Sequence, residues 1–410
     1  MTDTAHTHTL VSVPGGVTAA SGFLASGISA GLKQDGALDV ALVVADGPPV
    51  PAAAVFTTNS VAAAPVLVSR RHIASGFARA VVINAGNANA CTGPRGIVDA
   101  EQTARALADV LGGESGEMIV SSTGVIGVPL PVETLVAALP HAAESLSADG
   151  GDRAAHAIMT TDTVAKQHAV RLEFAGRTIT VGGMAKGSGM IKPNMATMLS
   201  VITTDAPLTS AACDAALRTA VDTTFNCVTV DSDTSTNDMV VLLASGAAGG
   251  AAIGPRSPAF AAVASAVTEV ARVLAIMVAR DGEGATKLVT VTVNGATTDV
   301  DARIAAFAVA DSPLVKTAIF GRDANWGRVA MALGKCGCAI DADAFDITFA
   351  GIEVCRGGAG IAFDEELALS ALSADEVAID VDLHLGDGGA RVWTCDLTYD
   401  YVRINGEYRS

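Results

Sequence analysis

The sequence has 410 residues, of which 50% are hydrophobic, 17% charged and only 4% aromatic, and its formal net charge is −17. A chain of this length exceeds a single ordinary hydrophobic core, so two domains are expected. The apolar content excludes a disordered chain and predicts a large core of small aliphatic side chains, as in helices packed on sheets. The negative charge argues against a nucleic-acid partner, because phosphate binding needs a basic surface.

No membrane span and no signal peptide are expected. The most apolar long run, residues 239–254, is broken by Ser245 and several glycines, and the N-terminus lacks a basic start followed by an apolar segment. The 7 cysteines include no CxxC pair, and Cys336 and Cys338 are the only close couple. This number and spacing of cysteines is typical of a cytoplasmic protein with reduced thiols and does not favour a metal site.

Apolar patterns typical of strands and of helices alternate irregularly along the chain. In the first half they predict strands at 39–45, 52–58, 80–83 and 117–120, helices at 98–111, 131–139 and 153–159, a hairpin over 170–174 and 178–181, and a strand from 199 to 203. In the second half they predict helices at 210–221, 258–279, 302–308 and 326–333, a strand at 287–293, and hairpins at 346–354 and over 377–385 and 391–397. Hairpins are too frequent for a purely parallel sheet, so we expect an α/β (α+β) fold with layered, mixed sheets.

The most informative stretch is residues 185–199. It reads AKGSGMIKPNMATML, a glycine-rich cationic loop that passes through a proline into an apolar strand. Thr197 stands where the loop enters the strand. A threonine there is either a plain strand or capping residue, or a nucleophile whose proton is removed by a base. The 7 histidines form no Ser/His/Asp pattern, so we do not expect a histidine base.

A cut of the chain before Thr197 would give this residue a base of its own. The new α-amino group has an ordinary pKa of about 7.7–8.0, and it lies within hydrogen-bond reach of its own Oγ. The same Oγ can make the cut beforehand, by attacking the Ala196 carbonyl in an N-to-O acyl shift. The residues alone leave both interpretations of Thr197 open.

Three further features are candidates for chemistry, and each has a structural alternative. Thr123 and Gly124 either supply a hydroxyl and a backbone N–H to an oxyanion hole or form a strand-to-loop turn. Lys186 and Lys192 either pair with a substrate carboxylate or are solvated loop lysines. Glu283 stands between two glycines, in a loop that either approaches a ligand or is a common turn.

Other motifs argue against further classes of site. The chain contains no GxxxxGK[ST] phosphate loop and no HExxH zinc pair. The acidic loop at 231–238 lacks the glycine and the late glutamate of a calcium loop. It therefore predicts a hydrogen-bonded structural loop.

Several motifs, in order along nearly the whole chain, resemble the ornithine acetyltransferase family, also called glutamate N-acetyltransferase, of arginine biosynthesis. They are NAGNANACTG at 84–93, TTDT at 160–163, KGSGMIxPNMATML at 186–199, ARDGEGATK at 279–287 and YVRINGEY at 401–408. The resemblance implies a layered α/β fold that is shared with a group of self-cleaving aminopeptidases.

The resemblance also implies how the chain matures and what it does. The precursor would cut itself between Ala196 and Thr197 into an α chain (1–196) and a β chain (197–410), which stay together as a cytoplasmic α2β2 heterotetramer. Thr197 would take the acetyl group from N2-acetyl-L-ornithine and pass it to L-glutamate. The products would be L-ornithine and N-acetyl-L-glutamate.

The family's roles transfer onto the matching residues of this chain. Thr197 matches the nucleophile, and Thr123 and Gly124 match the oxyanion-hole pair. The substrate-contacting positions are Thr160, Lys186, Thr197, Glu283, Asn405 and Ser410. No metal and no cofactor are implied, and the use of acetyl-CoA as a second acetyl donor to glutamate stays open.

Two other functions are compatible with the residues. One is an N-terminal-threonine aminopeptidase or amidohydrolase, which differs in letting water reach the acyl-enzyme. The other is a non-catalytic protein whose glycine loops bind a small anion. An intact bond between Ala196 and Thr197 would favour this second alternative.

Overall fold

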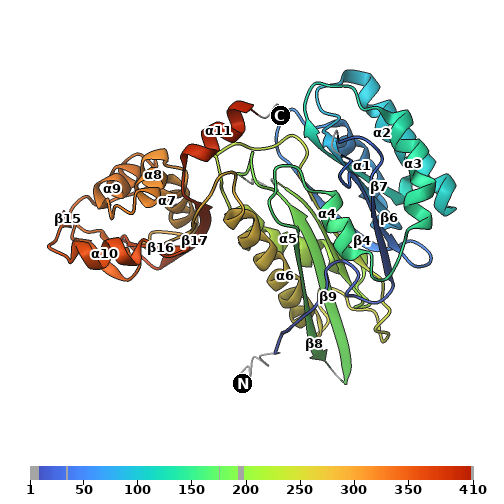
Figure 1. The fold of residues 1–410 in the computed structure, drawn as a ribbon. Coiled ribbons are helices and arrows are strands. Elements are labelled where there is room, and N and C mark those ends of the chain that lie inside the picture. The colour runs from blue at the N-terminus through green and yellow to red at the C-terminus, as the bar shows by residue number, and fades with distance from the viewer. Residues whose placement is uncertain (1–8, 34–35, 175, 193–197, 408–410) are drawn as a thin grey trace.

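The computed structural model describes residues 9–33, 36–174, 176–192 and 198–407 (Figure 1). The helices are α1 (Ala64–His72), α2 (Gly93–Leu111), α3 (Val132–Glu144), α4 (Gly151–Ala157), α5 (Ser210–Thr223), α6 (Phe260–Arg280), α7 (Asp299–Ala310), α8 (Pro313–Phe320), α9 (Trp326–Gly334), α10 (Glu365–Ala371) and α11 (Tyr399–Glu407). The strands are β1 (Val11–Val13), β2 (Phe23–Ile28), β3 (Val40–Ala45), β4 (Val50–Phe56), β5 (Phe77–Ala78), β6 (Ala80–Asn87), β7 (Met118–Val125), β8 (Lys166–Phe174), β9 (Arg177–Lys186), β10 (Leu199–Thr204), β11 (Met239–Ala244), β12 (Leu288–Ala296), β13 (Asp346–Phe349), β14 (Ile352–Arg356), β15 (Ala359–Gly360), β16 (Glu376–Asp382) and β17 (Gly388–Cys395).

Within these residues the strands form three mixed sheets. The central sheet has the order β1-β8-β9-β10-β11-β4-β5, and in it β10 runs parallel to β11 and antiparallel to β9. The second sheet has the order β2-β3-β6-β7, with β6 parallel to β7. The third has the order β15-β14-β13-β16-β12-β17. Each sheet contains parallel and antiparallel pairs, so the predicted mixed α/β class is confirmed.

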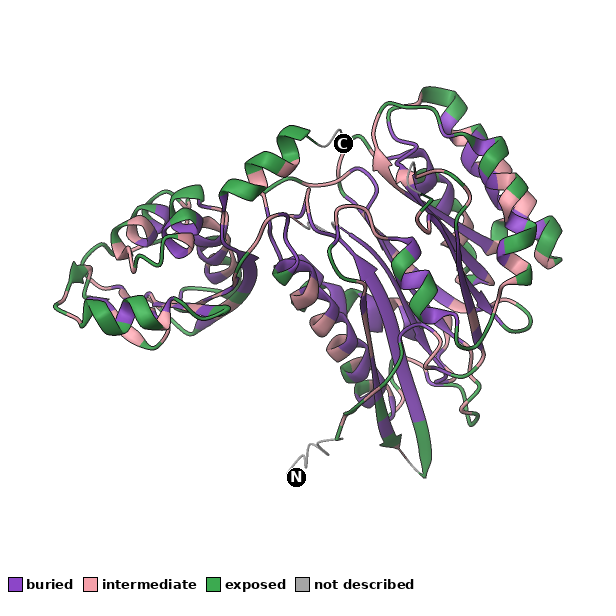
Figure 2. Ribbon diagram, viewed as in Figure 1, coloured by how far each residue is buried: buried purple, intermediate pink, exposed green. Residues whose placement is uncertain are grey.

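The chain before β12 packs as four layers (Figure 1). Helices α5 and α6 cover one face of the central sheet, in a core that includes Ile202 and Leu274. The other face packs against the second sheet and α4, and Val201, Ile83 and Ile158 share one cluster there. Helices α1, α2 and α3 cover the outer face of the second sheet. Figure 2 shows the strands of both sheets as largely buried.

Helix α6 is long and apolar enough to resemble a membrane span, but its packing explains its composition. It is 21 residues long, and its buried residues recur along one face from Ala262 to Ala279. This face packs against α5, β8 and β9. The apolar character of α6 is therefore that of a core helix.

Strands β12, β13, β14, β16 and β17 and helices α7, α8 and α9 share a separate hydrophobic core, in the unit on the left of Figure 1. Its centre joins Val291, Ile347 and Ile379 of the sheet to Ala306 and Leu333 of the helices. Helix α11 follows β17 and leads back toward the layered body. The second packed unit therefore begins near β12, whereas the cut predicted at 196/197 falls between two neighbouring strands of the central sheet.

Polar side chains at the N-caps fix where several helices begin. The side chains of Thr209, Thr298, Ser312, Asn325 and Asp364 each accept a hydrogen bond from a backbone N–H in the first turn of the helix that follows. Such a bond satisfies a donor that has no partner inside the helix. Local sequence thus sets the starts of α5, α7, α8, α9 and α10.

One predicted hairpin is wrong. The segments near 377–385 and 391–397 form β16 and β17, but β12 lies between them, parallel to β16 and antiparallel to β17. Both sides of β12 are thereby paired, and its alternate residues Val289, Val291 and Val293 are buried in the core. Pairing with the sequence-distant strand β12 therefore replaces the direct hairpin between β16 and β17. The apolar patterns also do not predict helices α1, α8, α10 and α11.

The ends of four strands come together where the central and second sheets meet. Leu199, the first residue of β10, pairs with Lys186, the last residue of β9, and on its other side with Met239, the first residue of β11. Thr123 lies near the end of β7. These strand ends carry most of the polar motifs singled out in the sequence.

A glycine before α4 is required by its contact with β2. An added Cβ at Gly150 would lie 1.8 Å from the Ala25 carbonyl oxygen, although the backbone φ of −77° is ordinary. We expect Gly150→Ala to lower the free energy of unfolding by about 1–3 kcal/mol, because backbone must move to relieve the overlap. Urea unfolding measures the change. The control is Gly116→Ala, whose Cβ would meet no atom within 4 Å; equal losses in the two variants would contradict the steric explanation.

Candidate active site

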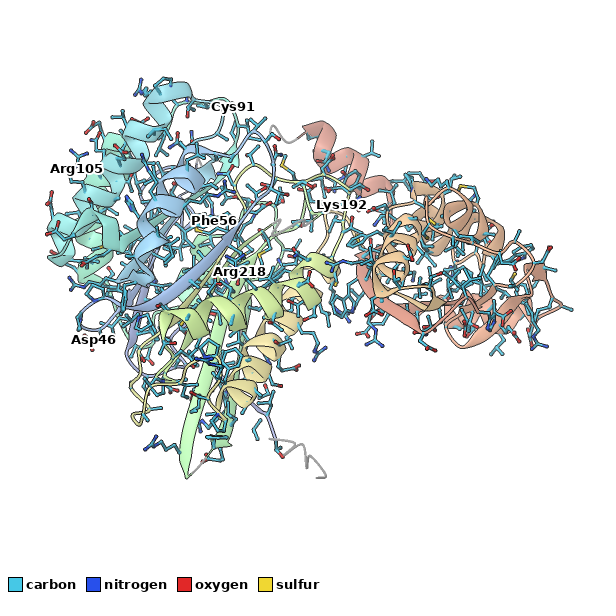
Figure 3. The ribbon with its side chains drawn as sticks, turned by 180° about the vertical axis from the view of Figure 1, so that it is seen from behind. Asp46, Phe56, Cys91, Arg105, Lys192 and Arg218 are labelled. Carbon is cyan, nitrogen blue, oxygen red and sulfur yellow. The ribbon has the colours of Figure 1, made fainter. Side chains whose placement is uncertain are left out.

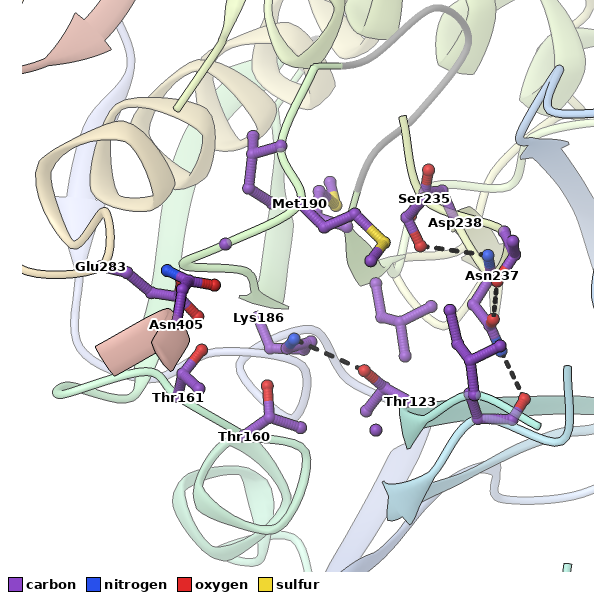
Figure 4. A pocket seen from close by; sticks show the side chains of 18 residues that line it. Thr123, Thr160, Thr161, Lys186, Met190, Ser235, Asn237, Asp238, Glu283 and Asn405 are labelled. Carbon is purple, nitrogen blue, oxygen red and sulfur yellow. Dashed lines mark hydrogen bonds between the residues drawn. The ribbon is translucent and has the colours of Figure 1, made fainter. Parts of the chain in front are cut away.

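One pocket collects the residues predicted to carry the chemistry (Figure 4). Its described wall consists of Ala88, Thr123, Gly124, Ile126, Thr160, Thr161, Lys186, Gly189, Met190, Ile191, Met198, Leu199, Ser235, Thr236, Asn237, Asp238, Glu283 and Asn405. Six predicted site residues are among them, namely Thr123, Gly124, Thr160, Lys186, Glu283 and Asn405. Ala196, Thr197 and Ser410 lie outside the described residues. Met198, which is bonded to Thr197, is part of the wall.

Elements from the whole length of the chain build this pocket. Thr123 and Gly124 come from β7, and Lys186 from the end of β9. Thr160 follows α4, Glu283 follows α6, and Asn405 lies on α11. The pocket therefore forms only when both sheets of the body and the C-terminal helix are in place.

Gly124 has a structural reason to be glycine. Its φ is +131°, and an added Cβ would lie 2.4 Å from the carbonyl carbon of Gly86 on the paired strand β6. No other residue fits without moving two strands. The same close approach leaves the Gly124 backbone at the pocket wall, beside the Thr123 hydroxyl.

Lys186 is the one cationic side chain in the described part of the pocket wall. Its side chain is buried, with Nζ 3.4 Å from Thr123 Oγ1 and 3.9 Å from Asp162 Oδ2. Burial lowers the pKa of Lys186, and the carboxylate of Asp162 opposes this effect most strongly. Because the ammonium group donates to Oγ1, the Thr123 hydroxyl is free to direct its own proton elsewhere.

Lys192 does not belong to the described wall of the pocket. It lies toward the C-terminal unit (Figure 3), where its Nζ is 2.7 Å from Asp311 Oδ2 and 5.8 Å from the ring centre of Phe307. The structural alternative is therefore the better interpretation of Lys192.

A buried ion cluster next to Lys186 holds three segments together. Lys166 Nζ lies 2.7 Å from Asp162 Oδ1 and 2.5 Å from Asp281 Oδ2, and the Lys166 side chain is 0% exposed. Asp162 also accepts the backbone N–H of Thr160 at 3.0 Å and that of Gly187 at 2.7 Å. The cluster thus positions the backbone on both sides of the pocket, at Thr160 and next to Lys186.

The sequence motifs and spacings do not predict a function for Asp162, Lys166 or Asp281. Asp162 and Asp281 lie inside the motifs TTDT and ARDGEGATK, while Lys166 is the first residue of β8 and belongs to no motif. Both segments that hold the three residues, 160–168 (TTDTVAKQH) and 279–287 (ARDGEGATK), contain several other polar residues, so the sequence does not single them out. Their proximity is a tertiary property, because Asp281 is 115 residues away from Lys166.

Glu283 and Asn405 form the side of the pocket nearest α11. Asn405 Nδ2 donates to Glu283 Oε2 at 2.8 Å, and the Glu283 N–H donates to the Ser188 carbonyl at 2.9 Å. Gly189 gives Glu283 room, since an added Cβ there would lie 2.4 Å from its carboxylate. A carboxylate held in this way is suited to a cationic group of a ligand.

The acidic loop at 231–238 is hydrogen-bonded as predicted, with one exception. Asp231 accepts the N–H groups of Met190 at 2.6 Å and Ile191 at 2.8 Å. Asn237 donates to the carbonyls of Ala88 and Ser122. Asp238 is different, because its Oδ2 is buried and has no hydrogen-bond partner. Burial raises the pKa of Asp238 well above its usual range, despite a hydrogen bond from Ser235 and the charge of Lys186.

In the described parts of the chain, no group of three or more His, Cys, Asp or Glu side chains has the arrangement of a metal site. The pocket instead combines a buried ammonium, a hydroxyl, a tightly placed glycine and two carboxyl groups. This set is suited to binding a small zwitterion and to stabilising negative charge on a carbonyl oxygen.

The ion cluster should make stability depend on pH. Burial alone would raise the pKa of Asp162, but the charges of Lys186 and Lys166 and the hydrogen bonds outweigh it and lower the pKa to about 2. Because the folded pKa lies below the unfolded one, ionised Asp162 stabilises the protein above about pH 4, and this contribution is lost as pH falls toward about 2. We expect Asp162→Asn to be less stable than the unmodified protein at about pH 6 and the difference to shrink at about pH 3.

Urea unfolding at several pH values measures this difference. Asp152→Asn serves as control, since Asp152 is an exposed aspartate whose side chain is 64% accessible, and its effect should stay within about 0.5 kcal/mol. A pH-independent difference for Asp162→Asn would contradict the assignment.

A family model and individual relatives of this chain point to the same protein family. A model of the ArgJ family matches residues 24–410. The arginine biosynthesis bifunctional protein ArgJ of Symbiobacterium thermophilum is 54% identical over 398 residues, which are 97% of this chain and 99% of that protein. The protein of the same name from Mycobacterium bovis is 47% identical over 417 residues and covers 100% of both chains.

A crystal structure of the arginine biosynthesis bifunctional protein ArgJ from Bacillus halodurans also matches. It is 47% identical, with a TM-score of 0.51, and the match covers 52% of this chain and 100% of the solved chain. Since the family model and both full-length relatives cover nearly the whole sequence, this chain belongs to the ArgJ family.

Proposed function

We propose that this member of an acetyltransferase family of arginine biosynthesis transfers the acetyl group of N2-acetyl-L-ornithine to L-glutamate through an acetyl-Thr197 intermediate. The observation that carries the proposal is the pocket itself. It brings six family-matched residues from several distant segments to one wall, next to Met198. The nucleophile would arise when the precursor cuts itself between Ala196 and Thr197.

The sheet topology supports such a cut. The bond lies in the connection between β9 and β10, which are hydrogen-bonded from Lys186–Leu199 to Val181–Thr204. An α chain of 1–196 and a β chain of 197–410 would therefore stay joined through the central sheet. The solved chain from Bacillus halodurans, matched in full by 52% of this sequence, has the length expected for one product of a cut near the middle.

We infer that acyl transfer depends on Thr197 and on the oxyanion-hole pair. The α-amine of Thr197 takes the proton of its own Oγ, which then attacks the acetyl carbonyl. The Gly124 N–H and the Thr123 hydroxyl are the donors for the resulting oxyanion. Lys186 donates to Thr123 Oγ1, which orients the threonine proton toward the pocket. Each such donor is worth about 3–4 kcal/mol in the transition state.

The remaining residues would bind the amino-acid substrates. Lys186 is suited to a substrate carboxylate, and Glu283, held by Asn405, to an ammonium group. Thr160 adds a hydroxyl to the same wall, and we assign Ser410 to the same set from the family resemblance. We further propose an α2β2 assembly in the cytoplasm.

A second activity is proposed because the relatives are called bifunctional. In this activity acetyl-CoA would acetylate the same threonine, and glutamate would again be the acceptor. We expect it to be measurable but slower than transfer from N2-acetylornithine.

The decisive experiment is an assay with N2-acetyl-L-ornithine, with and without L-glutamate. We expect L-ornithine and N-acetyl-L-glutamate in equal amounts, and little acetate, because an acetyltransferase excludes water from its acyl-enzyme. A parallel reaction with acetyl-CoA and glutamate measures the second activity. Release of acetate at a rate that glutamate does not change would instead indicate a hydrolase.

The role of Thr197 is tested by its substitution. Thr197→Ala lacks the nucleophile, so we expect a single uncut chain of 41.0 kDa and a loss of acetyl transfer of about 10³-fold or more. Intact-mass spectrometry detects the cut. Thr197→Ser keeps a hydroxyl and should still be cut and active. A cut or active Thr197→Ala protein would refute the assignment.

A further inference from the structure

Among the described residues of the pocket wall, Asp238 is the one ionisable side chain to which the proposed function gives no role. It lies directly before β11 and is 2% exposed. Its own carbonyl accepts the Thr57 N–H at 3.0 Å, and the next residue, Met239, donates to the Met198 carbonyl at 3.1 Å. These bonds fix Asp238 next to the strand that begins just after Thr197, and therefore next to the proposed reaction centre.

Asp238 receives one hydrogen bond, from the Ser235 side chain, and its carboxyl group is otherwise not engaged by the fold. Its Oδ2 has no hydrogen-bond partner, whereas Asp231 of the same loop accepts three backbone N–H groups. Burying an ionised oxygen without a partner is costly, so the neutral acid is favoured. The buried, unpartnered oxygen in the wall of this polar pocket therefore favours the protonated form of Asp238.

The proposed reaction has a proton that Thr197 cannot carry. In the first half, Oγ bonds to the acetyl carbon, the C–N bond breaks, and the Oγ proton passes through the α-amine to the leaving nitrogen. Ornithine then still needs a second proton to depart as the ammonium ion. In the second half, glutamate arrives as an α-ammonium ion and must lose one proton before its nitrogen can attack. The α-amine of Thr197 carries one proton in each half-reaction. In each half-reaction a second proton, on the substrate nitrogen, therefore has no assigned carrier.

We propose that Asp238 is a catalytic residue that carries this second proton. Its carboxylic acid protonates the amine of departing ornithine, and the carboxylate so formed takes one proton from the α-ammonium group of incoming glutamate. The free amine then attacks the acetyl-enzyme and gives its next proton to the α-amine of Thr197, as Oγ leaves. Asp238 ends the cycle protonated, as it began, so protons balance and no other reactant is required. This inference rests on the proposed function.

The other charged groups of the site are already engaged. The titratable side chains of the described pocket wall are Lys186, Asp238 and Glu283. Lys186, from the end of β9, donates to Thr123, and Glu283, from the loop after α6, accepts from Asn405. Behind the wall, Asp162 is paired with Lys166. Asp238 is the member of this set with an unpartnered buried oxygen.

The test compares an acetyl donor whose leaving group must be protonated with one whose leaving group need not be. It also compares an acetyl acceptor that must first lose a proton with one that need not. Asp238→Asn keeps the shape of the side chain but cannot carry a proton. With N2-acetyl-L-ornithine as donor we expect kcat to fall by about 10²-fold, the usual contribution of general acid catalysis. With p-nitrophenyl acetate, whose leaving group departs as an anion, the burst of acetyl-enzyme formation should be nearly unchanged. The acetyl-enzyme should likewise react normally with hydroxylamine, which is largely unprotonated at neutral pH, but slowly with glutamate.

Controls separate this role from a structural one. Asp205 is a buried aspartate outside the pocket wall that accepts the backbone N–H groups of Thr180 and Ser21. Asp205→Asn should change the rates with both donors equally. Equal losses with both donors in Asp238→Asn would overturn the inference. Failure of the unmodified protein to transfer acetyl from N2-acetylornithine to glutamate would instead refute the proposed function.

The unmodified protein offers a second measurement that does not depend on how Asp238→Asn matures. The rate with N2-acetylornithine should fall as rising pH ionises Asp238, whereas the rate with p-nitrophenyl acetate should not. Among the described residues, Lys186 is the charged group that acts on Asp238, and its charge favours ionisation. Glu283 is the other charged side chain of the same described wall. The same falling limb with both donors would contradict the role of Asp238.

Discussion

The pocket depends on a lysine that is buried between two aspartates. Lys166 contacts Asp162 and Asp281 in a region with almost no solvent access. Removing one partner from such a group typically costs about 3–5 kcal/mol, because it leaves an uncompensated buried charge. The start of β8, the loop after α4 and the loop after α6 must therefore meet in one arrangement. That arrangement places Thr160, Lys186 and Glu283 around the same space.

The same cluster explains why two buried aspartates of this site differ in protonation. Asp162 has two cations and two backbone N–H groups near it, and its pKa is lowered to about 2. Asp238 has one neighbouring cation, one hydroxyl donor and one oxygen without a partner, and burial raises its pKa. Burial is similar in both cases, so the supply of partners decides the charge. Behind the pocket wall, Asp162 is thereby favoured as a carboxylate next to Lys186, whereas Asp238, in the wall, is favoured as a neutral acid.

Much of this architecture could be predicted from the sequence, but only where the information is local. Strands such as β3 and β10 and helices such as α5 and α6 follow from apolar periodicity, and the motifs identified six residues that the structure brings to one pocket. The insertion of β12 between β16 and β17 could not be predicted, because long-range pairing leaves no trace in either segment. The special position of Asp238 could not be predicted for a related reason. Whether a buried carboxyl oxygen has a hydrogen-bond partner depends on the folded structure around it and not on the local sequence.

The topology also constrains how a new chain end can serve as a base. An N-terminus created within an exposed loop would be solvated and mobile, and its amine would not stay near one hydroxyl. Here the strand that begins two residues after Thr197 is held on both sides, because Leu199 pairs with Lys186 and with Met239. Met198 lies in the pocket wall, and its carbonyl accepts the Met239 N–H. A chain that starts at Thr197 is therefore tethered to the pocket within one residue of its end. The fold can lose the peptide bond before Thr197 without losing the pairing that places the new amine, and this is the condition that a self-made nucleophile and base require.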